Sequence, residues 1–225
     1  MRDVVNLIFD KDSFFEMTKF FGRGIITGFA RINGYSVAIF ANDSNFYAGS
    51  MSAEGAQKTS RFIRLCETFN IPIVSLVDEP GFLIGPDAEK AGTILHGTEA
   101  VLATTESTVP WTTVMIRKSF GVAAAAHYGP DGYVLAWPSA ESGPLPLEGG
   151  VAVAFKKEIA QAANPEAKRK ELEEKMAKNQ NPFPRAEAFS VHEIIDPRET
   201  RRYISLWADR IQGQLKASLM KDKLI

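Results

Sequence analysis

The sequence predicts an α/β fold built around parallel strands, and three observations lead to that prediction. Short runs of branched apolar residues alternate with longer segments of helical periodicity from residue 71 onward. A strand–helix–strand–helix–strand order of this kind is typical of parallel crossovers. The chain has 225 residues, of which 45% are hydrophobic and 24% are charged, so it can bury a sizeable core.

The N-terminal part is expected to form a short helix followed by a β-hairpin. Apolar residues at helical spacing within residues 1–22 indicate an amphipathic helix. Asn33 and Gly34 lie between two apolar runs, and this dipeptide is a strong signal for a tight turn between antiparallel strands. We therefore expect strands over residues 25–32 and 35–41.

The central part is expected to alternate strands with helices. Apolar runs that end at turn residues predict the strands, and rough apolar stripes predict the helices. The expected strands are residues 71–77, 111–116 and 132–137. The expected helices are residues 54–70, residues 87–105 and a third that begins at Gly121, where a glycine precedes an alanine-rich stretch.

The C-terminal part is expected to be helical. Residues 151–178 have helical character with a break at Asn164-Pro165, and their charge run is typical of a solvated helix face with i,i+4 ion pairs. We expect one domain over residues 1–225, with a C-terminal helical extension at about residues 198–225. The last helix is expected over residues 198–220, with an apolar stripe of Ile204, Trp207, Ile211, Leu215 and Leu219.

Composition and charge exclude several classes of function. Basic and acidic residues number 26 and 27, so no general field attracts nucleic acid or an anionic membrane surface. Cys66 is the single cysteine, which excludes an intramolecular disulfide and a cysteine-rich zinc site. His96, His127 and His192 lack metal-ligand spacing, so we expect no metal and treat each as a surface or hydrogen-bonded structural residue. Without a signal peptide or a membrane-length apolar run, the chain is expected to be soluble and cytoplasmic.

Two glycine-bearing turns follow expected strands and are the candidate sites of chemistry. The first spans residues 78–85, with Gly81 and Gly85, and the second spans residues 117–124, with Gly121. Ligands gather at the carboxyl ends of parallel strands, and glycine lets the backbone approach a ligand closely. Small residues that lead into a helix also leave N–H groups available to stabilise a negative oxygen, such as that of an enolate. From spacing alone, plain strand-to-helix turns are the favoured interpretation of both segments.

The two turns belong to a longer series of motifs with a specific order and spacing. Together these motifs resemble the C-terminal, crotonase-like half of the carboxyltransferase β subunit of biotin-dependent acyl-CoA carboxylases of the acetyl- or propionyl-CoA type. The resemblance extends over about residues 12–205, nearly the whole chain. It is carried mainly by GFARINGYSVAIFAN (28–42), RFIRLC (61–66), VDEPGF (77–82), RKSFG (117–121), AWPSAE (136–141), EGG (148–150) and NPFPRAEAFSVHEIIDPRETR (181–201).

This resemblance implies a fold and an activity. The implied fold is a crotonase-like ββα superhelix with a parallel sheet core. The implied enzyme transfers a carboxyl group between carboxybiotin, borne covalently by a carrier protein, and a coenzyme A thioester, and backbone N–H groups stabilise the enolate oxygens of both. Implied partners are the biotin carboxyl carrier protein, a biotin carboxylase subunit, an N-terminal carboxyltransferase half and further copies of the chain.

The resemblance also implies roles for residues of the two turns. The oxyanion hole on the biotin side falls on the expected catalytic residues, Gly121, Val122 and Ala123. The expected substrate-binding residues are Gly81, Phe82 and Gly85 of the first turn and Arg117 and Lys118 beside the second. For the two cations, a charge contact with the CoA phosphates or a carboxylate and a purely structural role are equally open.

Three features depart from the family pattern. Val122 stands where the family has a second glycine, which keeps the backbone donors but adds a side chain that needs room. Pro146, within SGPLPLEGG at residues 142–150, stands where many relatives have a glycine. The N-terminal half, which holds the thioester oxyanion hole and most CoA contacts in the family, is expected to come from a separate subunit or from a longer chain.

Three other functions remain open. A biotin-dependent decarboxylase subunit would run the same half-reaction in reverse, and the sequence does not separate it from a carboxylase. A crotonase-type hydratase or isomerase would need carboxylates beside the oxyanion hole, and Glu141 and Glu148 are candidates although they match the carboxyltransferase pattern. The chain is also consistent with an assembly module that is inert without its N-terminal half.

Overall fold

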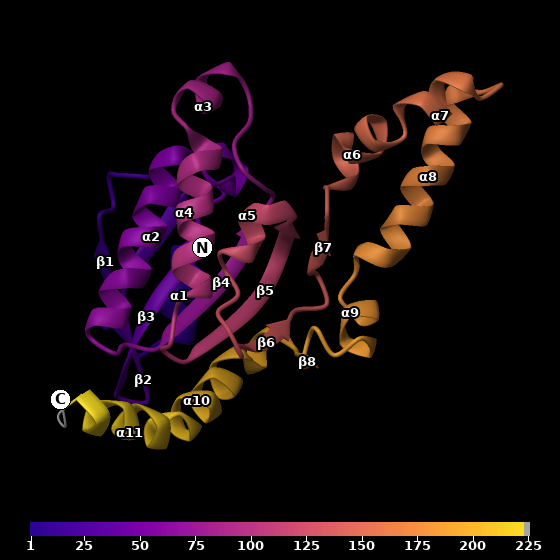
Figure 1. Ribbon diagram of the computed structural model, residues 1–225. Helices are drawn as coiled ribbons and strands as arrows, with labels where there is room; N and C mark the ends of the chain where they lie inside the picture. Colours follow the sequence, from indigo (N-terminus) through magenta and orange to yellow (C-terminus); the bar gives the residue numbers. More distant parts are fainter. Residues whose placement is uncertain (223–225) are drawn as a thin grey trace.

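The computed structural model describes residues 1–222 and has an eight-stranded mixed sheet at its centre (Figure 1). The strand order is β1-β2-β3-β4-β5-β6-β8, and β7 pairs with the end of β5. The pairs β1–β2 and β2–β3 are antiparallel, and the other pairs in the described residues are parallel, which confirms the predicted α/β class. The strands are β1 (Phe15–Met17), β2 (Ile25–Ile32), β3 (Tyr35–Asn42), β4 (Ile73–Glu79), β5 (Trp111–Phe120), β6 (Tyr133–Ala136), β7 (Glu141–Gly143) and β8 (Glu193–Ile194).

Helices cover both faces of this sheet (Figure 1). On one face lie α2 (Ala53–Thr68) and α4 (Thr93–Thr105), and on the other lie α1 (Arg2–Ile8) and α10 (Thr200–Arg210). The remaining helices are α3 (Pro86–Lys90), α5 (Gly121–Ala125), α6 (Leu147–Ala154), α7 (Lys156–Gln161), α8 (Pro165–Gln180), α9 (Phe183–Glu187) and α11 (Gln212–Asp222), with short 3-10 turns η1 (Tyr47–Gly49) and η2 (Pro197–Glu199).

The hairpin predicted at Asn33-Gly34 forms as expected. Its two strands, β2 and β3, pair along their full lengths. Asn33 and Gly34 have φ angles of 48° and 81°, as a two-residue type I′ turn requires. Side chains of β3 then alternate between the two faces, so that Phe40 joins the core under α2 and α4 while Ile39 joins the core under α1 and α10.

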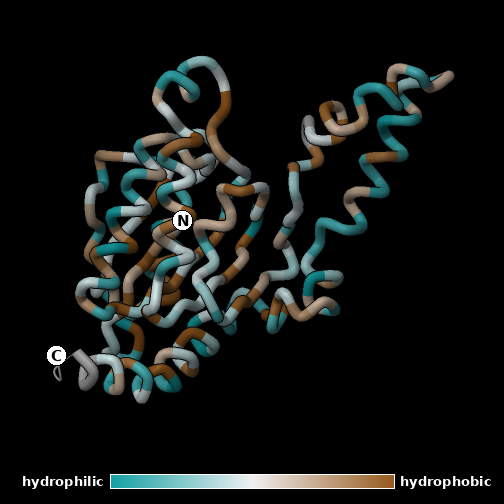
Figure 2. The backbone as a smooth tube through the Cα atoms, viewed as in Figure 1, coloured by the Kyte–Doolittle hydropathy of each residue, from teal (hydrophilic) through white to brown (hydrophobic). Residues whose placement is uncertain are grey.

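An apolar core lies on each face of the sheet and buries it. Figure 2 shows apolar stretches along the strands. The core under α2 and α4 contains Cys66 and the nearly buried ring of Trp111. The opposite core contains Ile204 and Trp207 of the predicted C-terminal stripe, so α10 is part of the main body. Of the rest of that stripe, Ile211 is buried and Leu215 is partly buried, and the side chain of Leu219 lies outside the described residues.

Several elements have different limits from those predicted. The helix predicted over residues 87–105 is divided into α3 and α4, because Gly92 adopts a left-handed conformation with φ 72°. The strand predicted over residues 111–116 continues to Phe120, because β7 adds a parallel partner to its end. The helix predicted over residues 198–220 is divided at Ile211 into α10 and α11.

Helices α6, α7 and α8 form an arm that extends away from the sheet (Figure 1). The predicted break at Asn164-Pro165 is the start of α8, where the Asn164 side chain accepts a hydrogen bond from Ala167 N at 3.1 Å. Ion pairs lie on the exposed surface of α8, including Arg169 with Glu173 at 2.7 Å, as the charge run predicts. The charged surface of α8 is therefore the solvated side of the arm.

Candidate active site

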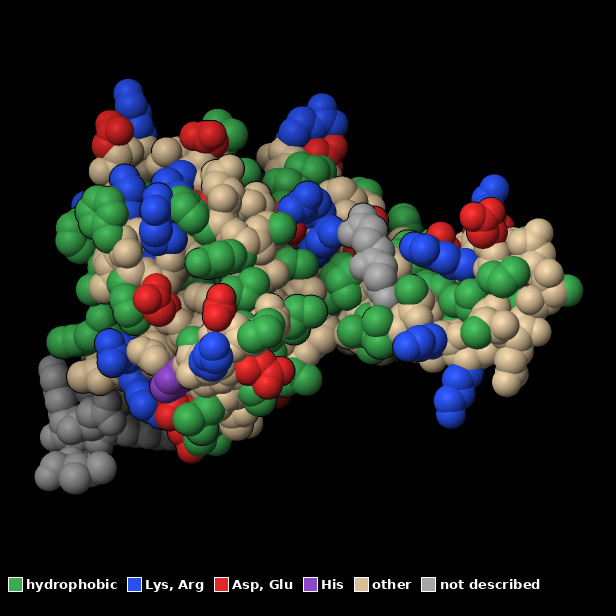
Figure 3. All heavy atoms as spheres, turned by 90° about the horizontal axis from the view of Figure 1, so that it is seen from above, with side chains coloured by type: hydrophobic (Ala, Val, Ile, Leu, Met, Phe, Trp, Pro, Cys, Tyr) green, Lys and Arg blue, Asp and Glu red, His purple; other side chains and the backbone are tan. Residues whose placement is uncertain are grey.

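A groove of about 800 Å³ opens between the sheet body and the arm. Its walls come from the turn after β4, from α4, from the start of α5 and from the segment that joins β7 to α6. Four of the predicted site residues line it, namely Gly81, Phe82, Gly121 and Val122. In the view from above, hydrophobic side chains gather between the body and the arm (Figure 3).

The first turn begins where β4 ends, and its backbone is held by hydrogen bonds. Gly81 has a φ of 129°, which only glycine adopts without strain. Its N–H group donates to Glu79 Oε1 at 2.9 Å, and its carbonyl accepts from Met51 N at 3.1 Å. Leu83 N donates to Met51 O at 2.9 Å. The Gly81 amide is therefore used inside the protein, and the turn contributes a shaped wall rather than this donor.

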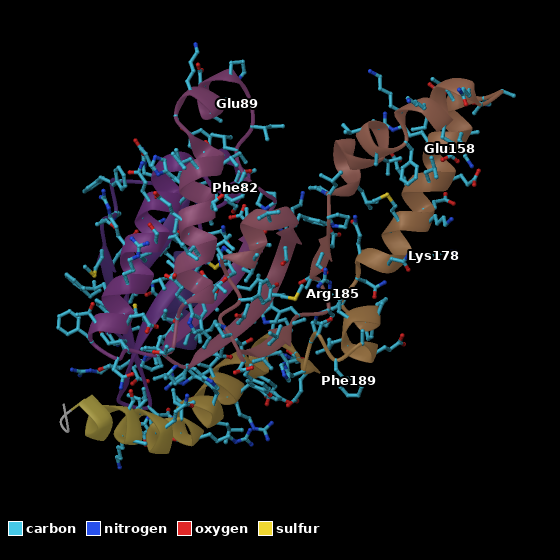
Figure 4. All side chains as sticks on the ribbon, in the orientation of Figure 1. Phe82, Glu89, Glu158, Lys178, Arg185 and Phe189 are labelled. Carbon is cyan, nitrogen blue, oxygen red and sulfur yellow. The ribbon has the colours of Figure 1, made fainter. Side chains whose placement is uncertain are left out.

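The side chain of Phe82, which belongs to the first turn, lies against α4 (Figure 4). A Cβ atom on Gly97 of α4 would stand 2.4 Å from two atoms of the Phe82 ring. The glycine at position 97 therefore leaves the space that this edge of the ring occupies. The ring is partly buried and its remaining surface forms part of the groove.

In the second turn, Gly121 follows the end of β5 and is the first residue of α5. Its φ of 66° is left-handed, and a Cβ atom there would meet Pro144 O at 3.5 Å. The N–H groups of the first turn of a helix have no acceptor four residues back, so those of Val122 and Ala123 are directed out of the helix end. The Val122 side chain is 68% exposed and lines the groove, whereas the Ala123 side chain is buried in the core under α4.

The other three predicted binding residues lie outside the groove lining. Gly85, with φ 115°, immediately precedes α3. Arg117 makes a double contact with Asp78, from Nε to Oδ1 at 2.9 Å and from Nη2 to Oδ2 at 3.0 Å. The backbone N–H of Lys118 donates to Asp78 Oδ1 at 3.2 Å. The Asp78 carboxylate thus ties the end of β4 to β5, directly beside both turns.

A fully buried polar cluster lies behind the first turn. It contains Glu79, whose Oε2 accepts from Asn42 Nδ2 at 2.9 Å, and His127, whose Nδ1 is 2.8 Å from Ser75 Oγ. Glu79 Oε2 and His127 Nε2 are 3.8 Å apart. Burial raises the pKa of Glu79 to about 8 and lowers the pKa of His127 to about 3, so both groups are mainly neutral near pH 7. His127 is thus a hydrogen-bonded structural histidine, one of the two roles expected for it.

Sequence reasoning missed Glu79 and the arm side of the groove. Glu79 follows Asp78 in a turn that begins with acids, so its burial has no local signal. Leu145 and Val153 line the groove and are 40% and 74% exposed. Leu145 precedes α6 and Val153 lies within it. Exposed apolar residues in and beside an apolar helix are unusual, and the apolar composition of this segment was the signal that the sequence offered. Pro146, one of the departures from the family pattern, lines the same groove as Val122.

Two kinds of site are not found in the described residues. Within residues 1–222, no three His, Cys, Asp or Glu side chains lie where they could together hold a metal ion. Among the helices of the same range, none is long and apolar enough to cross a bilayer. The side chains that line the groove are mainly apolar, with the hydroxyl residues Ser50 and Thr98 among them.

Comparisons with known proteins identify relatives. The carboxyl transferase domain family model matches residues 1–218. The chain is 41% identical over 206 residues to the carboxyltransferase subunit of propionyl-CoA carboxylase from Haloferax mediterranei, covering 89% of this chain and 40% of that subunit. It is 39% identical over 219 residues to the α subunit of methylmalonyl-CoA decarboxylase from Propionigenium modestum, covering 95% and 42% of the two chains.

A solved structure is similar to this chain in fold as well as in sequence. The transcarboxylase 12S subunit, described as a hexamer and solved with methylmalonyl-CoA and methylmalonic acid bound, has a TM-score of 0.88 and 38% identity over 94% of this chain and 42% of that one. The chain thus spans about two fifths of the length of the relatives it matches. It belongs to the carboxyl transferase family, and its α/β architecture is the crotonase-like fold of these carboxyltransferases.

Proposed function

We propose that this chain is the C-terminal half of a biotin-dependent acyl-CoA carboxyltransferase, which moves a carboxyl group between carboxybiotin and an acyl-CoA. One observation carries the proposal. Two turns that are about 40 residues apart, after β4 and after β5, form one groove in a family member, and four of the eight residues that the resemblance assigns to the site line it.

The groove suits the ring of biotin. Its side chains are mainly apolar, and a flat, weakly charged ring binds such a lining when a few polar groups fix its orientation. A Cβ atom on Gly81 would meet no atom within 4 Å, so the space beside this glycine is open to a ligand. When bound, carboxybiotin supplies the carboxyl group that is transferred.

The second turn provides the polar groups that the reaction requires. The N–H groups of Val122 and Ala123 lie at the positive end of a short helix, where a negative oxygen is stabilised. Such donors act most strongly in a site from which water is excluded, and the Val122 side chain places apolar surface beside them that a bound ligand would cover. We therefore assign to Gly121, Val122 and Ala123 the stabilisation of negative charge that develops on a ligand oxygen.

The first turn and the two cations have supporting roles in this proposal. Gly81 and Phe82 form the opposite wall, and Gly85 allows the chain to leave that wall and enter α3. The double contact of Arg117 with Asp78 favours the structural role among the two that the sequence leaves open. This pair keeps the two turns at a fixed separation.

The acyl group and the direction of transfer are the finer part of the proposal. We propose a short acyl-CoA of the propionyl type, which the relative at 41% identity favours. A biotin-dependent decarboxylase subunit is a second candidate, because the decarboxylase relative is 39% identical over 95% of this chain. A hydratase has no support from Glu141, which is exposed on β7 and does not line the groove. The side chain of Glu148, the other candidate carboxylate, lies outside the described residues.

The proposed activity needs partners. We propose a biotin carboxyl carrier protein, a biotin carboxylase subunit, an N-terminal carboxyltransferase half and further copies of this chain, together in the cytoplasm. Two relatives support this proposal: the relative from Haloferax mediterranei is a carboxyltransferase subunit of propionyl-CoA carboxylase, and the transcarboxylase 12S relative is described as a hexamer.

A carboxyl-exchange assay tests the proposal. The chain is combined with a complementary N-terminal carboxyltransferase half, and transfer of labelled carboxyl from methylmalonyl-CoA or malonyl-CoA to free biotin is measured. We expect transfer that needs both the chain and biotin. Hydration of an enoyl-CoA, or no exchange in an assembled complex with any short acyl-CoA, would contradict the proposal.

A further inference from the structure

The wall formed by the first turn is anchored to the body through one buried carboxyl group. Glu79 has no exposed surface and lies at the end of β4. Its Oε1 accepts from Gly81 N at 2.9 Å and from Met51 N at 3.3 Å. Its Oε2 accepts from Asn42 Nδ2, which also donates to Gly49 O at 3.1 Å. One side chain thus connects the end of β3, the end of β4 and the segment before α2.

The N–H group of Met51 is shared between two acceptors. It lies 3.3 Å from Glu79 Oε1 and 3.1 Å from Gly81 O. The bond to Gly81 O, with the bond from Leu83 N to Met51 O, forms the short bridge that holds residues 81–83 against the body. How the Met51 N–H divides between its two acceptors therefore affects where this wall lies relative to the body.

The geometry also places the carboxyl proton. Oε1 accepts two N–H groups, whereas Oε2 accepts one, from Asn42 Nδ2, and faces His127 Nε2 at 3.8 Å. His127 Nε2 is buried and has no hydrogen-bond partner among the residues that the structure describes. Its ring is stacked on Phe40 with centroids 4.1 Å apart, and its Nδ1 is bound to Ser75, so the ring is fixed with Nε2 toward the carboxyl group. The Oε2 side of the carboxyl group, which carries fewer N–H donors than Oε1, is therefore the side that can hold the proton.

Charged and titratable groups around Glu79 favour this neutral form. Asp78 precedes it in β4 and adds a negative charge, which raises the pKa of Glu79 further beyond the effect of burial. Arg117 of β5 pairs with Asp78 rather than with Glu79, and the Lys118 N–H also donates to Asp78. His127 is itself neutral, because burial lowers its pKa to about 3.

We propose that Glu79 is a positioning residue for carboxyl transfer: in its protonated form it leaves the Met51 N–H to Gly81 O and so holds the Gly81–Leu83 wall of the groove in place. Loss of the proton makes Oε1 a charged and stronger acceptor. The N–H groups of both Met51 and Gly81 are then drawn toward Glu79. The bond from Met51 N to Gly81 O weakens while the bond from Gly81 N to Oε1 strengthens, so residues 81–83 shift relative to the body. The effect on catalysis rests on the proposed function, whereas the effect on the backbone does not.

The first test measures the backbone directly in the chain alone. The amide ¹H and ¹⁵N shifts of Met51 and Gly81 are followed between about pH 6 and about pH 9.5. We expect both amides to move together with one midpoint near 8, and this movement to be absent in Glu79→Gln. Glu89→Gln is the matched control, because Glu89 is an exposed carboxylate on α3 near the same turn (Figure 4) and its removal should leave the titration unchanged. Wild-type amides that do not titrate would overturn the proposal without any variant.

The second test uses the exchange assay with the complementary half. We expect the KM for biotin in the wild type to rise about fivefold across the same midpoint, as the loss of one hydrogen bond predicts at about 1.4 kcal/mol per tenfold, with kcat nearly constant. In Glu79→Gln the KM should not vary with pH. Exchange with a KM that does not depend on pH in the wild type would overturn the positioning role and leave the proposed function intact. Titrating amides without any exchange would remove the proposed function and leave the proton-dependent wall.

Discussion

At the scale of single residues, Gly121 joins a strand to the helix end that faces the groove. Its φ of 66° is strained for any side chain, and a Cβ atom would have Pro144 O at 3.5 Å. We expect Gly121→Ala to lower the unfolding free energy by about 1 kcal/mol and to reduce kcat in the exchange assay by about tenfold or more, on the order of the loss of an oriented donor. Denaturant unfolding and single-turnover exchange measure the two effects.

A second glycine provides the matched control for that prediction. Gly34, in the hairpin between β2 and β3, also has positive φ, at 81°, and a Cβ atom there would meet no atom within 4 Å. Gly34→Ala should lower stability by a similar amount without changing kcat, because the hairpin turn lies outside the groove lining. Equal losses of kcat in the two variants would show that Gly121 acts through stability alone.

The residues of the site differ in how far the sequence discloses them. Gly81 and Gly121 can be predicted because a glycine directly after a buried strand, in a parallel α/β fold, stands at the sheet edge where ligands bind. Glu79 cannot, since its burial depends on Asn42 and His127, which come from other strands and turns. The family resemblance assigned Val122 to the site, and its exposed side chain at the groove is a tertiary result.

At the scale of secondary-structure elements, α4 sets the position of Phe82 through Gly97. A Cβ atom there would approach the Phe82 ring to 2.4 Å. Gly97→Ala should push the ring toward the groove, with a packing cost of about 1–3 kcal/mol offset by about 0.5–1 kcal/mol of helix propensity. We expect the KM for biotin to rise, as measured by exchange kinetics. The free energy of unfolding, measured with denaturant, should fall only slightly because the two contributions offset each other.

Gly213 of α11 serves as the control for the substitution at Gly97. A Cβ atom on Gly213 would meet no atom within 4 Å, so Gly213→Ala should leave KM unchanged and raise stability slightly. A Gly97→Ala variant with unchanged KM would mean that the Phe82 ring moves elsewhere, and that α4 does not shape the groove.

Elements governed by local signals could be predicted, and those governed by tertiary pairing could not. The hairpin at Asn33 needs only two adjacent residues with positive φ, and both were visible in the sequence. The division of α3 from α4 at Gly92 was not, because a glycine within a helical pattern is compatible with a continuous helix. Short β7 extends β5 only through pairing between residues that are about 20 positions apart.

At the scale of the whole molecule, the groove exposes apolar side chains that suit an interface with the proposed N-terminal half. Val153 is 74% exposed on the arm. Val153→Asp should weaken association with that half by about tenfold or more, because a charge would replace buried apolar surface. Stability of the isolated chain should change little, since the side chain is exposed. Sedimentation or interferometry with the purified half measures the affinity.

Leu7 on α1 is the matched control, because it is 80% exposed and lies outside the groove lining. Leu7→Asp should leave association with the half unchanged. If both variants weaken association equally, the groove is not the contact surface.

The stability of the whole fold should depend on pH through the buried pair Glu79 and His127. The pKa of Glu79 is about 8 in the folded state against an ordinary value of 4.5, so the folded state binds more protons and stability falls as pH rises from about 4.5 to about 8. The slope for one proton is at most about 1.4 kcal/mol per pH unit. Lys58 acts above this window with the opposite sign, because burial lowers its pKa to about 8, so measurements should end near pH 8.

On the acid side the sign is reversed. The pKa of His127 falls from 6.5 to about 3, so its contribution is present above pH 6.5 and is lost as pH falls toward 3. Between about pH 5 and pH 6.5 the slopes from Glu79 and His127 oppose each other, so the unfolding free energy should be nearly flat there. Between about pH 6.5 and pH 8 chemical unfolding should give a free energy that decreases, and Glu79→Gln should flatten this decrease while Glu89→Gln should not. A wild-type curve that is flat or rising between pH 6.5 and pH 8 would contradict the protonated state of Glu79, because His127 contributes no slope in that interval.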